Sequence, residues 1–256
     1  VPAERYRRVS VDRVDPCEIK IGDAVADHIQ AHGGTVSRAD LAGYQVRERE
    51  PIRGTYRDFE IVGPSPPVAS GIHIVQMLNI LEGFDVAGMG FGTADLSHLL
   101  AEVMKIAFAD RAAASGDPDF CDVPVERLTS KVFANELRAR IDMSNTQRWS
   151  TSVSPEHSPH TTHMTAADNR GNIAACTFTI NSLFGARFIV PGTGIIPNNY
   201  MATFDPRPGS VLSIAPGKRV TTSMSPMMAL RDGKLVYALG LPGGKRIFPS
   251  AMQALV

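Results

Sequence analysis

The hydrophobic pattern of this chain changes from helical to strand-like across one stretch that has no pattern at all, residues 144–160. This stretch (SNTQRWSTSVSPEHSPH) is rich in Ser, Thr and Pro, a composition typical of an exposed, mobile linker. Before it, apolar residues recur at helical spacing, with wide stripes over 71–83 and 93–114. After it, short alternating stretches predict strands. Because helices are gathered first and strands second, we expect an α+β fold rather than alternating βαβ units.

The individual elements follow from periodicity and from turn residues. Before the linker, helices are predicted over 21–32, from the N-cap Ser37 with Asp40 three residues on, and over 71–83, 93–114 and 130–141, together with a β-hairpin over 45–62 that has a breaker at Gly54. After the linker, strands are predicted over 161–167, 173–180, 186–190, 221–230 and 234–239, and a last helical stretch follows Gly240–Gly244. The first two of these strands flank a glycine-containing turn and predict a hairpin.

Charge and length exclude several classes of partner. The 256 residues include 26 Lys and Arg against 26 Asp and Glu, so no excess of positive charge marks a nucleic acid or an anionic membrane surface as a partner. No apolar run reaches the roughly 18 to 20 residues of a membrane span, and no targeting segment is visible, which leaves a periplasmic, secreted or cytoplasmic location open. Because Val1 is not an initiator Met, we expect a segment of a longer protein. A small neutral-to-polar molecule is the expected ligand.

Thr161 opens the first strand after the linker. An exposed linker that ends at a strand beginning Thr-Thr-His is a place where proteolysis or self-cleavage exposes a hydroxyl residue. A threonine at a new N-terminus carries its own base, because its α-amine, with a pKa of about 8, takes the Oγ proton directly or through one water. Thr161 is therefore a candidate nucleophile that attacks an amide or acyl carbonyl and forms an acyl-enzyme.

A series of motifs in fixed order resembles the γ-glutamyltranspeptidase family. The matching stretches are R-E-P-I-R-G-T-Y-R at 49, S-G-I-H-I-V-Q-M-L-N-I-L-E at 70, G-D-P-D-F at 116, T-T-H-M-T-A-A-D-N-R-G-N at 161, T-F-T-I-N at 177, G-I-I-P-N-N at 194, S-M-S-P at 223 and P-G-G-K-R-I at 242. The resemblance implies the N-terminal nucleophile hydrolase fold, a four-layer αββα sandwich that is incomplete in this chain. It also implies a proenzyme that cuts itself into two associating subunits: residues 1–160 would be the end of a large-subunit-like segment, finishing in the linker 144–160, and residues 161–256 the start of a small-subunit-like segment.

The same resemblance implies roles for particular residues. The cut would fall between His160 and Thr161, with Thr161 as both processing and catalytic nucleophile, and Thr179 would hold its hydroxyl. Gly243 and Gly244 match the pair whose backbone N–H groups form the oxyanion hole, a role that suits glycine because it lets a turn present two donors at close range.

Five further residues are expected to contact the substrate. Asn181, Thr222 and Ser223 match positions that hold the carboxylate and amino groups of a glutamyl moiety. Thr203 departs from the family pattern, which has an acidic residue there to pair with the substrate α-ammonium, and Tyr200 stands where Gln or Glu is common and reshapes the pocket. A neutral hydroxyl binds an ammonium group more weakly than a carboxylate does.

The resulting hypothesis is a γ-glutamyltransferase or hydrolase that acts on glutathione or a related γ-glutamyl amide, with water, an amino acid or a peptide as acceptor and without a cofactor. One alternative keeps the mechanism but takes an acyl amide that lacks an α-amino group, as a cephalosporin acylase does; another is an unprocessed relative that only binds. Each residue also has a structural interpretation: Thr161 as an ordinary strand start, Asn181 as a turn former, Thr222 and Ser223 as strand residues bonded to backbone, and Gly243–Gly244 as a plain strand-to-helix turn. His157, His160 and His163 have a spacing that suits neither a strand face nor a helical metal motif, so no metal is expected.

Overall fold

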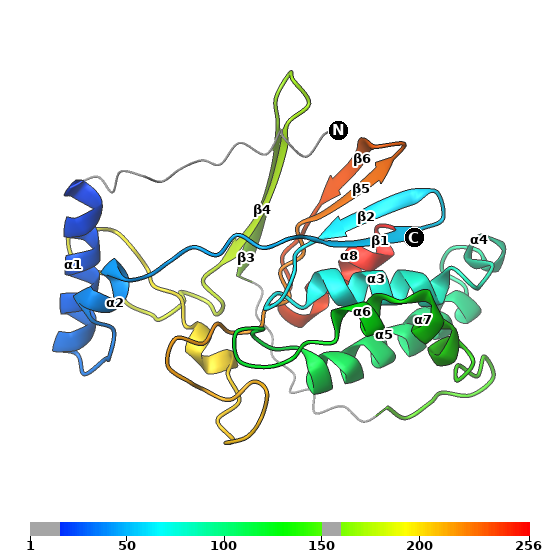
Figure 1. Ribbon diagram of the computed structural model, residues 1–256, viewed down its shortest axis with the longest axis horizontal. Coiled ribbons are helices and arrows are strands. Elements are labelled where there is room, and N and C mark those ends of the chain that lie inside the picture. Colours follow the sequence, from blue (N-terminus) through cyan, green and yellow to red (C-terminus); the bar gives the residue numbers. More distant parts are fainter. Residues whose placement is uncertain (1–15, 150–159) are drawn as a thin grey trace.

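The computed structural model describes residues 16–149 and 160–256 and has an α+β fold (Figure 1). The elements before the linker are α1 (Pro16–Ala31), α2 (Arg38–Ala42), β1 (Ile52–Tyr56), β2 (Phe59–Gly63), α3 (Ser70–Leu81), α4 (Val86–Met89), α5 (Ala94–Ala114), α6 (Val125–Thr129) and α7 (Lys131–Arg138). Those after it are β3 (Thr161–Ala167), β4 (Ile173–Thr179), the 3₁₀ turn Tyr200–Thr203, β5 (Met227–Arg231), β6 (Lys234–Leu239), the 3₁₀ turn Gly244–Arg246 and α8 (Ile247–Gln253). No helix in these two ranges is both long and apolar enough to cross a membrane.

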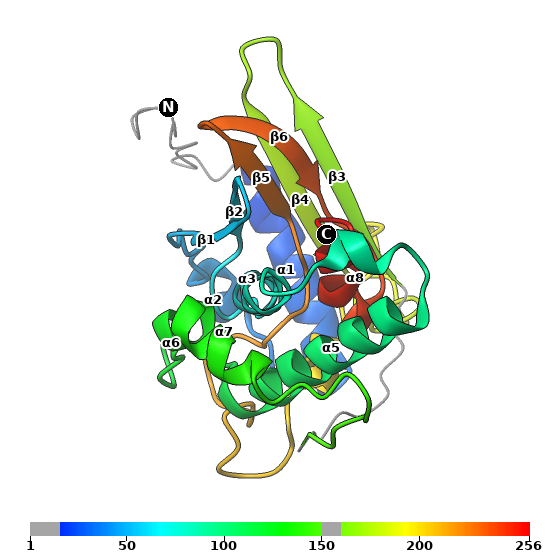
Figure 2. The ribbon, with the colours of Figure 1, turned by 90° about the vertical axis from the view of Figure 1, so that its right-hand side faces the viewer.

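One antiparallel sheet joins the parts of the chain on either side of the linker. Its strand order is β1-β2-β5-β6, and β2 pairs with β5 through Ile61 opposite Ala229. The hairpin β3-β4 forms a second sheet beside it, and β4 contacts β6 (Figure 2). Because β1 and β2 come from before residue 160 and β5 and β6 from after it, a cut at that position leaves two segments held together by backbone hydrogen bonds within one sheet.

Helix α3 is the centre of the core. All twelve of its residues are buried, because it lies between the four-stranded sheet and the helices α5, α6 and α7, with α8 beside it (Figure 2). A helix that is apolar around most of its circumference is stable only when it is covered on all sides. The described residues therefore supply one helical layer, the four-stranded sheet and the β3-β4 sheet of the expected sandwich, while α1 and α2 stand apart, with His28 of α1 against Phe188 (Figure 1).

Within this core, α3 carries a buried histidine. The Nδ1 of His73 lies 3.0 Å from the Oε1 of Gln76, and its Nε2 lies 2.9 Å from the Oγ of Ser115. Because an amide oxygen only accepts, Nδ1 carries the proton and Nε2 accepts from the serine hydroxyl. Complete burial disfavours the imidazolium and lowers the pKa of His73 to about 4.

His73 is expected to make the protein less stable at acidic pH. The unfolded chain binds a proton at His73 near pH 6.5, whereas the folded chain binds it only near pH 4. The contribution of His73 to the free energy of unfolding is therefore complete above pH 6.5 and is lost as the pH falls toward 4. Between pH 6.5 and 5 the loss is about 2 kcal/mol. Urea unfolding at both pH values measures this loss in the free energy of unfolding. We expect the loss to be smaller by about 2 kcal/mol in His73→Gln and unchanged in His32→Gln, an exposed control. An equal loss in the two variants would contradict the prediction.

Most expected elements are confirmed. The structure has α1, α3, α5, α7, the β3-β4 hairpin and β6 where the sequence predicts them, and Ser37 and Asp40 form the capping box of α2. The short helices α4 and α6 were not predicted, because four or five residues carry too little periodicity.

Three local predictions are wrong. Gly54 is no breaker: it lies inside β1, where the side chain of Val75 occupies the space of a Cβ. Residues 186–190 form no strand, because Arg187 has a φ of 64° and the turn before it is also left-handed. The expected strand at 221–230 begins only at Met227. At the start of the expected linker, Thr146, Gln147 and Trp149 form hydrogen bonds with Glu102 of α5, and residues 150–159, including His157, lie outside the described residues.

Candidate active site

The β3-β4 hairpin places Thr161 at one end of its first strand, opposite Thr179. The hydroxyl of Thr179 donates to the carbonyl oxygen of His160 at 3.0 Å and accepts from the backbone N–H of Asn181 at 2.9 Å. The contact of Thr179 is therefore with the peptide bond that precedes Thr161, in a chain that is still uncut. Asp168 fixes the register from the far end of the hairpin, where its carboxylate accepts from the backbone N–H groups of Arg170 and Asn172.

A cavity of about 410 Å³ brings most of the expected residues together. The expected residues among its lining are Thr161, Asn181, Tyr200, Thr203, Thr222, Ser223 and Gly244. They come from β3, the loop after β4, the 3₁₀ turn, the segment before β5 and the turn before α8, five places that are far apart in the sequence. Thr179 and Gly243 do not line the cavity themselves but adjoin residues that do.

Asn181 is held in a left-handed conformation, with a φ of 73°. Its Nδ2 donates to the Oδ1 of Asn199 at 3.0 Å, and the same oxygen accepts from the backbone N–H of Ser182 at 3.0 Å. Asn199 thus orients Asn181 toward the cavity, a supporting role that no motif in the sequence indicates. The turn-forming and ligand-binding interpretations of Asn181 are compatible, since its backbone makes the turn and its side chain faces the site.

Thr222 reaches the cavity with a buried hydroxyl that has no hydrogen-bond partner among the described residues. Leaving such a group unpaired costs about 1 to 3 kcal/mol, so a bound molecule that forms a hydrogen bond with this hydroxyl would remove that cost. The backbone of Thr222 is bonded to neighbouring backbone, as the structural interpretation expects: it forms a bridge with Val68, and its carbonyl oxygen accepts from the N–H of Ala69 at 3.0 Å. The nearby hydroxyls of Ser225 and Ser70 donate to the carbonyl oxygens of Ser223 and Met224, which fixes this segment.

Gly243 and Gly244 form the turn between β6 and α8. Their φ values of 142° and 58° lie in regions that a residue with a side chain rarely adopts. The carbonyl oxygen of Gly243 accepts from the backbone N–H of Arg246 at 3.1 Å, which closes the turn. A substituted residue at Gly243 would therefore strain the backbone at the edge of the cavity.

Thr203 and Tyr200 form one wall of the cavity. The hydroxyl of Thr203 donates to the carbonyl oxygen of Tyr200 at 2.7 Å, and burial raises the pKa of the Tyr200 phenol, an effect that a hydrogen bond with Thr179 partly offsets. Asp205 is the one acidic residue among the described residues that line the cavity, and its carboxylate already pairs with Arg207 at 2.8 Å. That guanidinium holds the pKa of Asp205 well below its usual range. The wall thus has no uncommitted carboxylate to receive an ammonium group.

Both ring nitrogens of His163 lie within hydrogen-bond distance of threonine hydroxyls on the β3-β4 hairpin. Its Nδ1 lies 2.7 Å from the Oγ1 of Thr177, and its Nε2 lies 3.0 Å from the Oγ1 of Thr165. Its ring also fills the space next to Gly240, where an added Cβ would lie 2.2 Å from Nδ1. This contact ties β3, which begins with Thr161, to the segment that leads to the glycine pair.

Gly240→Ala is expected to lower activity, because the new methyl group displaces the His163 ring and with it β3. A kcat/KM measurement on the processed protein should show a loss of about tenfold, the size of a 1 to 2 kcal/mol displacement. The double variant Gly240→Ala with His163→Ala restores the space and should recover most of the loss relative to His163→Ala alone. If the double variant is as impaired as Gly240→Ala, the contact does not explain the effect.

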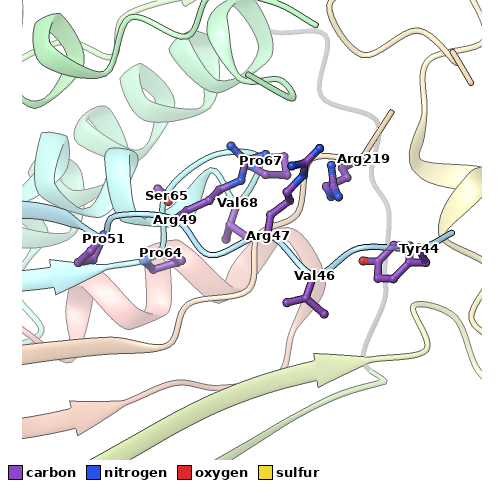
Figure 3. Close-up of a pocket in the computed structure, with 10 residues that line it drawn as sticks. All are labelled: Tyr44, Val46, Arg47, Arg49, Pro51, Pro64, Ser65, Pro67, Val68 and Arg219. Atoms are coloured by element: carbon purple, nitrogen blue, oxygen red, sulfur yellow. The ribbon is translucent and has the colours of Figure 1, made fainter. Parts of the chain in front are cut away.

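A second cavity, of about 400 Å³, lies between the segment after α2 and the loop after β2 (Figure 3). Arg47, Arg49 and Arg219 extend into it, with three prolines along its wall. Arg49 and Arg219 both lie near Asp119, at 3.6 and 3.3 Å, so much of their charge is balanced. None of the expected catalytic residues lines this cavity.

A strand that begins with a threonine, faces a cavity and follows a candidate cleavage point, within an α+β fold of this kind, is the arrangement of an N-terminal nucleophile hydrolase. Within that class, the family model for gamma-glutamyltranspeptidase matches residues 18–256, and the chain belongs to this family.

The similar proteins fall into two functional groups. The chain is 58% identical to an acylase ACY 1 proenzyme from Pseudomonas sp. strain SE83, over 93% of this chain and 42% of the relative. It is 39% identical to a glutathione hydrolase proenzyme from Escherichia coli K12, over 92% of this chain and 43% of the relative. Among solved structures, a cephalosporin acylase from Bacillus halodurans matches with a TM-score of 0.79 and 27% identity, over 92% of this chain and 42% of that one. The chain thus spans less than half the length of these relatives.

Proposed function

We propose that this chain carries the catalytic centre of a self-processing amide hydrolase or acyltransferase whose nucleophile is Thr161. The observation that carries the proposal is the single cavity in which Thr161 meets Asn181, Thr222 and Gly244. A threonine that only begins a strand is not expected to line the same cavity as the unpaired Thr222 hydroxyl and Gly244, a glycine in the left-handed region.

The first reaction is the cut between His160 and Thr161. The Oγ of Thr161 attacks the carbonyl carbon of His160, the peptide C–N bond breaks, and the nitrogen takes the hydroxyl proton and becomes the free α-amine. The resulting ester is then hydrolysed by water, which leaves His160 with a carboxylate and restores the hydroxyl. The hydroxyl of Thr179 already donates to the carbonyl oxygen on which negative charge develops, so it supports this step.

The second reaction is acyl transfer. The new α-amine of Thr161 accepts the Oγ proton while Oγ attacks the donor amide, and it returns the proton to the leaving amine. The backbone N–H groups of Gly243 and Gly244 are proposed to stabilise the oxyanion. Water or an amine acceptor, such as an amino acid or a peptide, then releases the acyl group from Thr161.

The first candidate donor is a γ-glutamyl amide such as glutathione, as the family membership and the Escherichia coli glutathione hydrolase proenzyme suggest. The second is an acyl amide that lacks an α-amino group, and two observations favour it. Thr203 supplies no negative charge, and the only acidic residue among the described lining, Asp205, is already paired with Arg207. The relative at 58% identity is an acylase.

The test compares hydrolysis of two anilides that differ only in the α-ammonium group, γ-glutamyl anilide and glutaryl anilide. A higher kcat/KM for the glutamyl compound supports the transpeptidase-type donor, and a higher value for the glutaryl compound supports the acylase-type donor. A chain that is never cut before Thr161 and hydrolyses neither compound would instead favour a relative that only binds.

A further inference from the structure

The loop between α5 and α6 contains a buried carboxylate that the proposed chemistry does not use. The side chain of Asp117 is fully buried, and both of its oxygens accept hydrogen bonds from the backbone. Oδ2 accepts from the N–H of Arg219 at 2.7 Å, and Oδ1 accepts from the N–H of Asp119 at 3.2 Å. The Nη2 of Arg49 lies 3.7 Å from Oδ1 and balances the negative charge. Asp117 thus connects its own loop to a part of the chain that lies 102 positions further on.

Asp117 itself is fixed relative to the core. Its carbonyl oxygen accepts from the backbone N–H of Phe120 at 2.9 Å, which folds the loop into a turn. Two residues earlier, the hydroxyl of Ser115 lies 2.9 Å from the Nε2 of His73 on the buried helix α3. A hydrogen bond from an N–H group to a carboxylate is roughly twice as strong as one between neutral groups. The carboxylate of Asp117 is therefore a firm anchor for the backbone at Arg219.

The backbone at Arg219 leads directly into the wall of the active-site cavity. Residues 221–224 all line that cavity, and they precede β5 without belonging to a helix or a strand. Their position therefore depends on individual hydrogen bonds. On the downstream side, the hydroxyl of Ser70 donates to the carbonyl oxygen of Met224. The bond between Asp117 and Arg219 holds the segment on its upstream side.

This segment supplies hydroxyl groups to the cavity. The hydroxyls of Thr221 and Thr222 are buried and have no hydrogen-bond partner among the described residues, and Ser223 follows them. The backbone of Thr222 also bonds to the loop after β2, but one residue alone separates Thr221 from Arg219. Because each residue has only two freely rotating backbone dihedrals, a displacement of Arg219 turns Thr221 and changes the direction in which the chain enters Thr222.

From this geometry we propose that Asp117 is a positioning residue for donor binding. By accepting from the backbone N–H of Arg219, it holds residues 221–223 where their hydroxyls meet the acyl part of the donor. The proposal rests on the proposed function, in which Thr222 and Ser223 contact the donor. Because Asp117 precedes the cut and Arg219 follows it, the bond joins the two segments of the processed enzyme.

A neighbouring carboxylate separates this backbone contact from the effect of charge. Asp119 lies 3.6 Å from the Nη2 of Arg49 and 3.3 Å from the Nη1 of Arg219. It therefore pairs with Arg219 through the guanidinium group, whereas Asp117 pairs with it through the backbone. Asp119→Asn removes a charge from the same cluster and leaves the backbone bond of Arg219 in place.

The matched variant, Asp117→Asn, breaks that bond selectively. An amide has one acceptor oxygen, so it cannot keep both backbone bonds of Asp117. The amide oxygen stays at the position of Oδ1, because an NH₂ group there would face the guanidinium of Arg49. The NH₂ group then faces the N–H of Arg219, and two donors repel each other. Asp117→Ala removes both acceptors and provides a second variant.

Self-cleavage and donor binding are expected to respond differently. The proposed cut involves Thr161, His160 and Thr179 and needs no donor, whereas turnover needs a donor held by residues 221–223. Loss of a contact that is equally strong in the ground state and the transition state raises KM and leaves kcat unchanged. A residue that only stabilises the fold would lower the yield of cut, folded protein and leave the KM of that protein unchanged. The KM of the cut enzyme is therefore the informative quantity.

The experiment uses the full chain, purified after self-cleavage. The kcat and KM of the wild type, Asp117→Asn, Asp117→Ala and Asp119→Asn are measured on whichever of γ-glutamyl anilide and glutaryl anilide the wild type hydrolyses faster. Both compounds carry a carboxylate that these hydroxyls can bind. Denaturing electrophoresis follows the cut, and thermal unfolding shows which variants are folded.

We expect KM to rise about tenfold in both Asp117 variants, the lower end of what a hydrogen bond to a charged group contributes. The kcat and the extent of the cut should stay within about twofold of the wild type, as should the KM of Asp119→Asn. Where only one Asp117 variant folds, its KM alone decides.

An unchanged KM in a folded Asp117 variant would overturn the proposal, as would an equal rise of KM in Asp119→Asn or a loss of kcat without a change in KM. Failure of both Asp117 variants to fold would also overturn it, because that result assigns Asp117 to the stability of the fold. A wild-type chain that is never cut and hydrolyses neither anilide would instead overturn the proposed function.

Discussion

Thr161→Ala is expected to leave the chain in one piece and to abolish turnover of both anilides. Without the Oγ atom neither the ester at His160 nor the acyl-enzyme can form, and no other hydroxyl in the cavity has an α-amine that cleavage would place beside it. Removal of a nucleophile costs at least about a thousandfold in rate. Denaturing electrophoresis and intact mass measure the cut, and anilide hydrolysis measures turnover.

The control for this prediction is Thr161→Ser, which retains a hydroxyl at the same position and is expected to retain cleavage. Thermal unfolding of both variants checks that the β3-β4 hairpin is intact, since Thr161 pairs with Thr179 at its end. N-terminal sequencing of the shorter wild-type piece should begin at Thr161. A Thr161→Ala chain that is still cut at this bond would show that another group performs the cleavage.

The parts of the fold that sequence alone predicted are those with strong local patterns. Helix α5 has an N-cap at Thr93 and an apolar stripe that runs from Leu96 to Ala107, and the β3-β4 hairpin has a turn closed by Asp168. The errors fell where tertiary contacts decide the conformation. Gly54 looks like a breaker in the sequence, but Val75 packs against it and only glycine fits there.

The candidate site was predictable in its residues but not in its contacts. Motifs in a fixed order pointed to Thr161, Asn181 and Gly244, and one cavity contains all three. The supporting residues carried no such signal, because Asn199 orients Asn181 through a hydrogen bond between residues 18 positions apart. The burial of Glu102 in α5 could not be predicted from the sequence either. A charged residue in a helix is usually exposed, and only the structure shows that Glu102 is buried and accepts from the Nε1 of Trp149.

Thr203→Asp is expected to shift the donor preference toward the γ-glutamyl compound by about tenfold or more, measured as the ratio of kcat/KM for γ-glutamyl anilide to that for glutaryl anilide. A carboxylate on this wall of the cavity pairs with the α-ammonium group, which only the glutamyl compound has. A hydrogen bond between charged groups contributes about 1.5 to 3 kcal/mol, which corresponds to tenfold to roughly a hundredfold. The glutaryl compound gains nothing from the change.

The neutral control, Thr203→Asn, separates charge from shape. Asn has nearly the size of Asp but no charge, and its Nδ2 group is able to donate to the Tyr200 carbonyl oxygen in place of the Thr203 hydroxyl, so this control keeps the bond while leaving out the charge. The new carboxylate must turn away from the Tyr200 carbonyl, because two acceptors repel each other, and the cavity offers the cationic side chains of Arg111, Arg207 and Lys245 along its lining. Those cations reduce the gain by competing with the substrate ammonium, which sets the expectation at the lower end of the range. If Thr203→Asp and Thr203→Asn give the same ratio, charge at this wall does not decide the donor, and the selectivity must come from the shape that Tyr200 imposes.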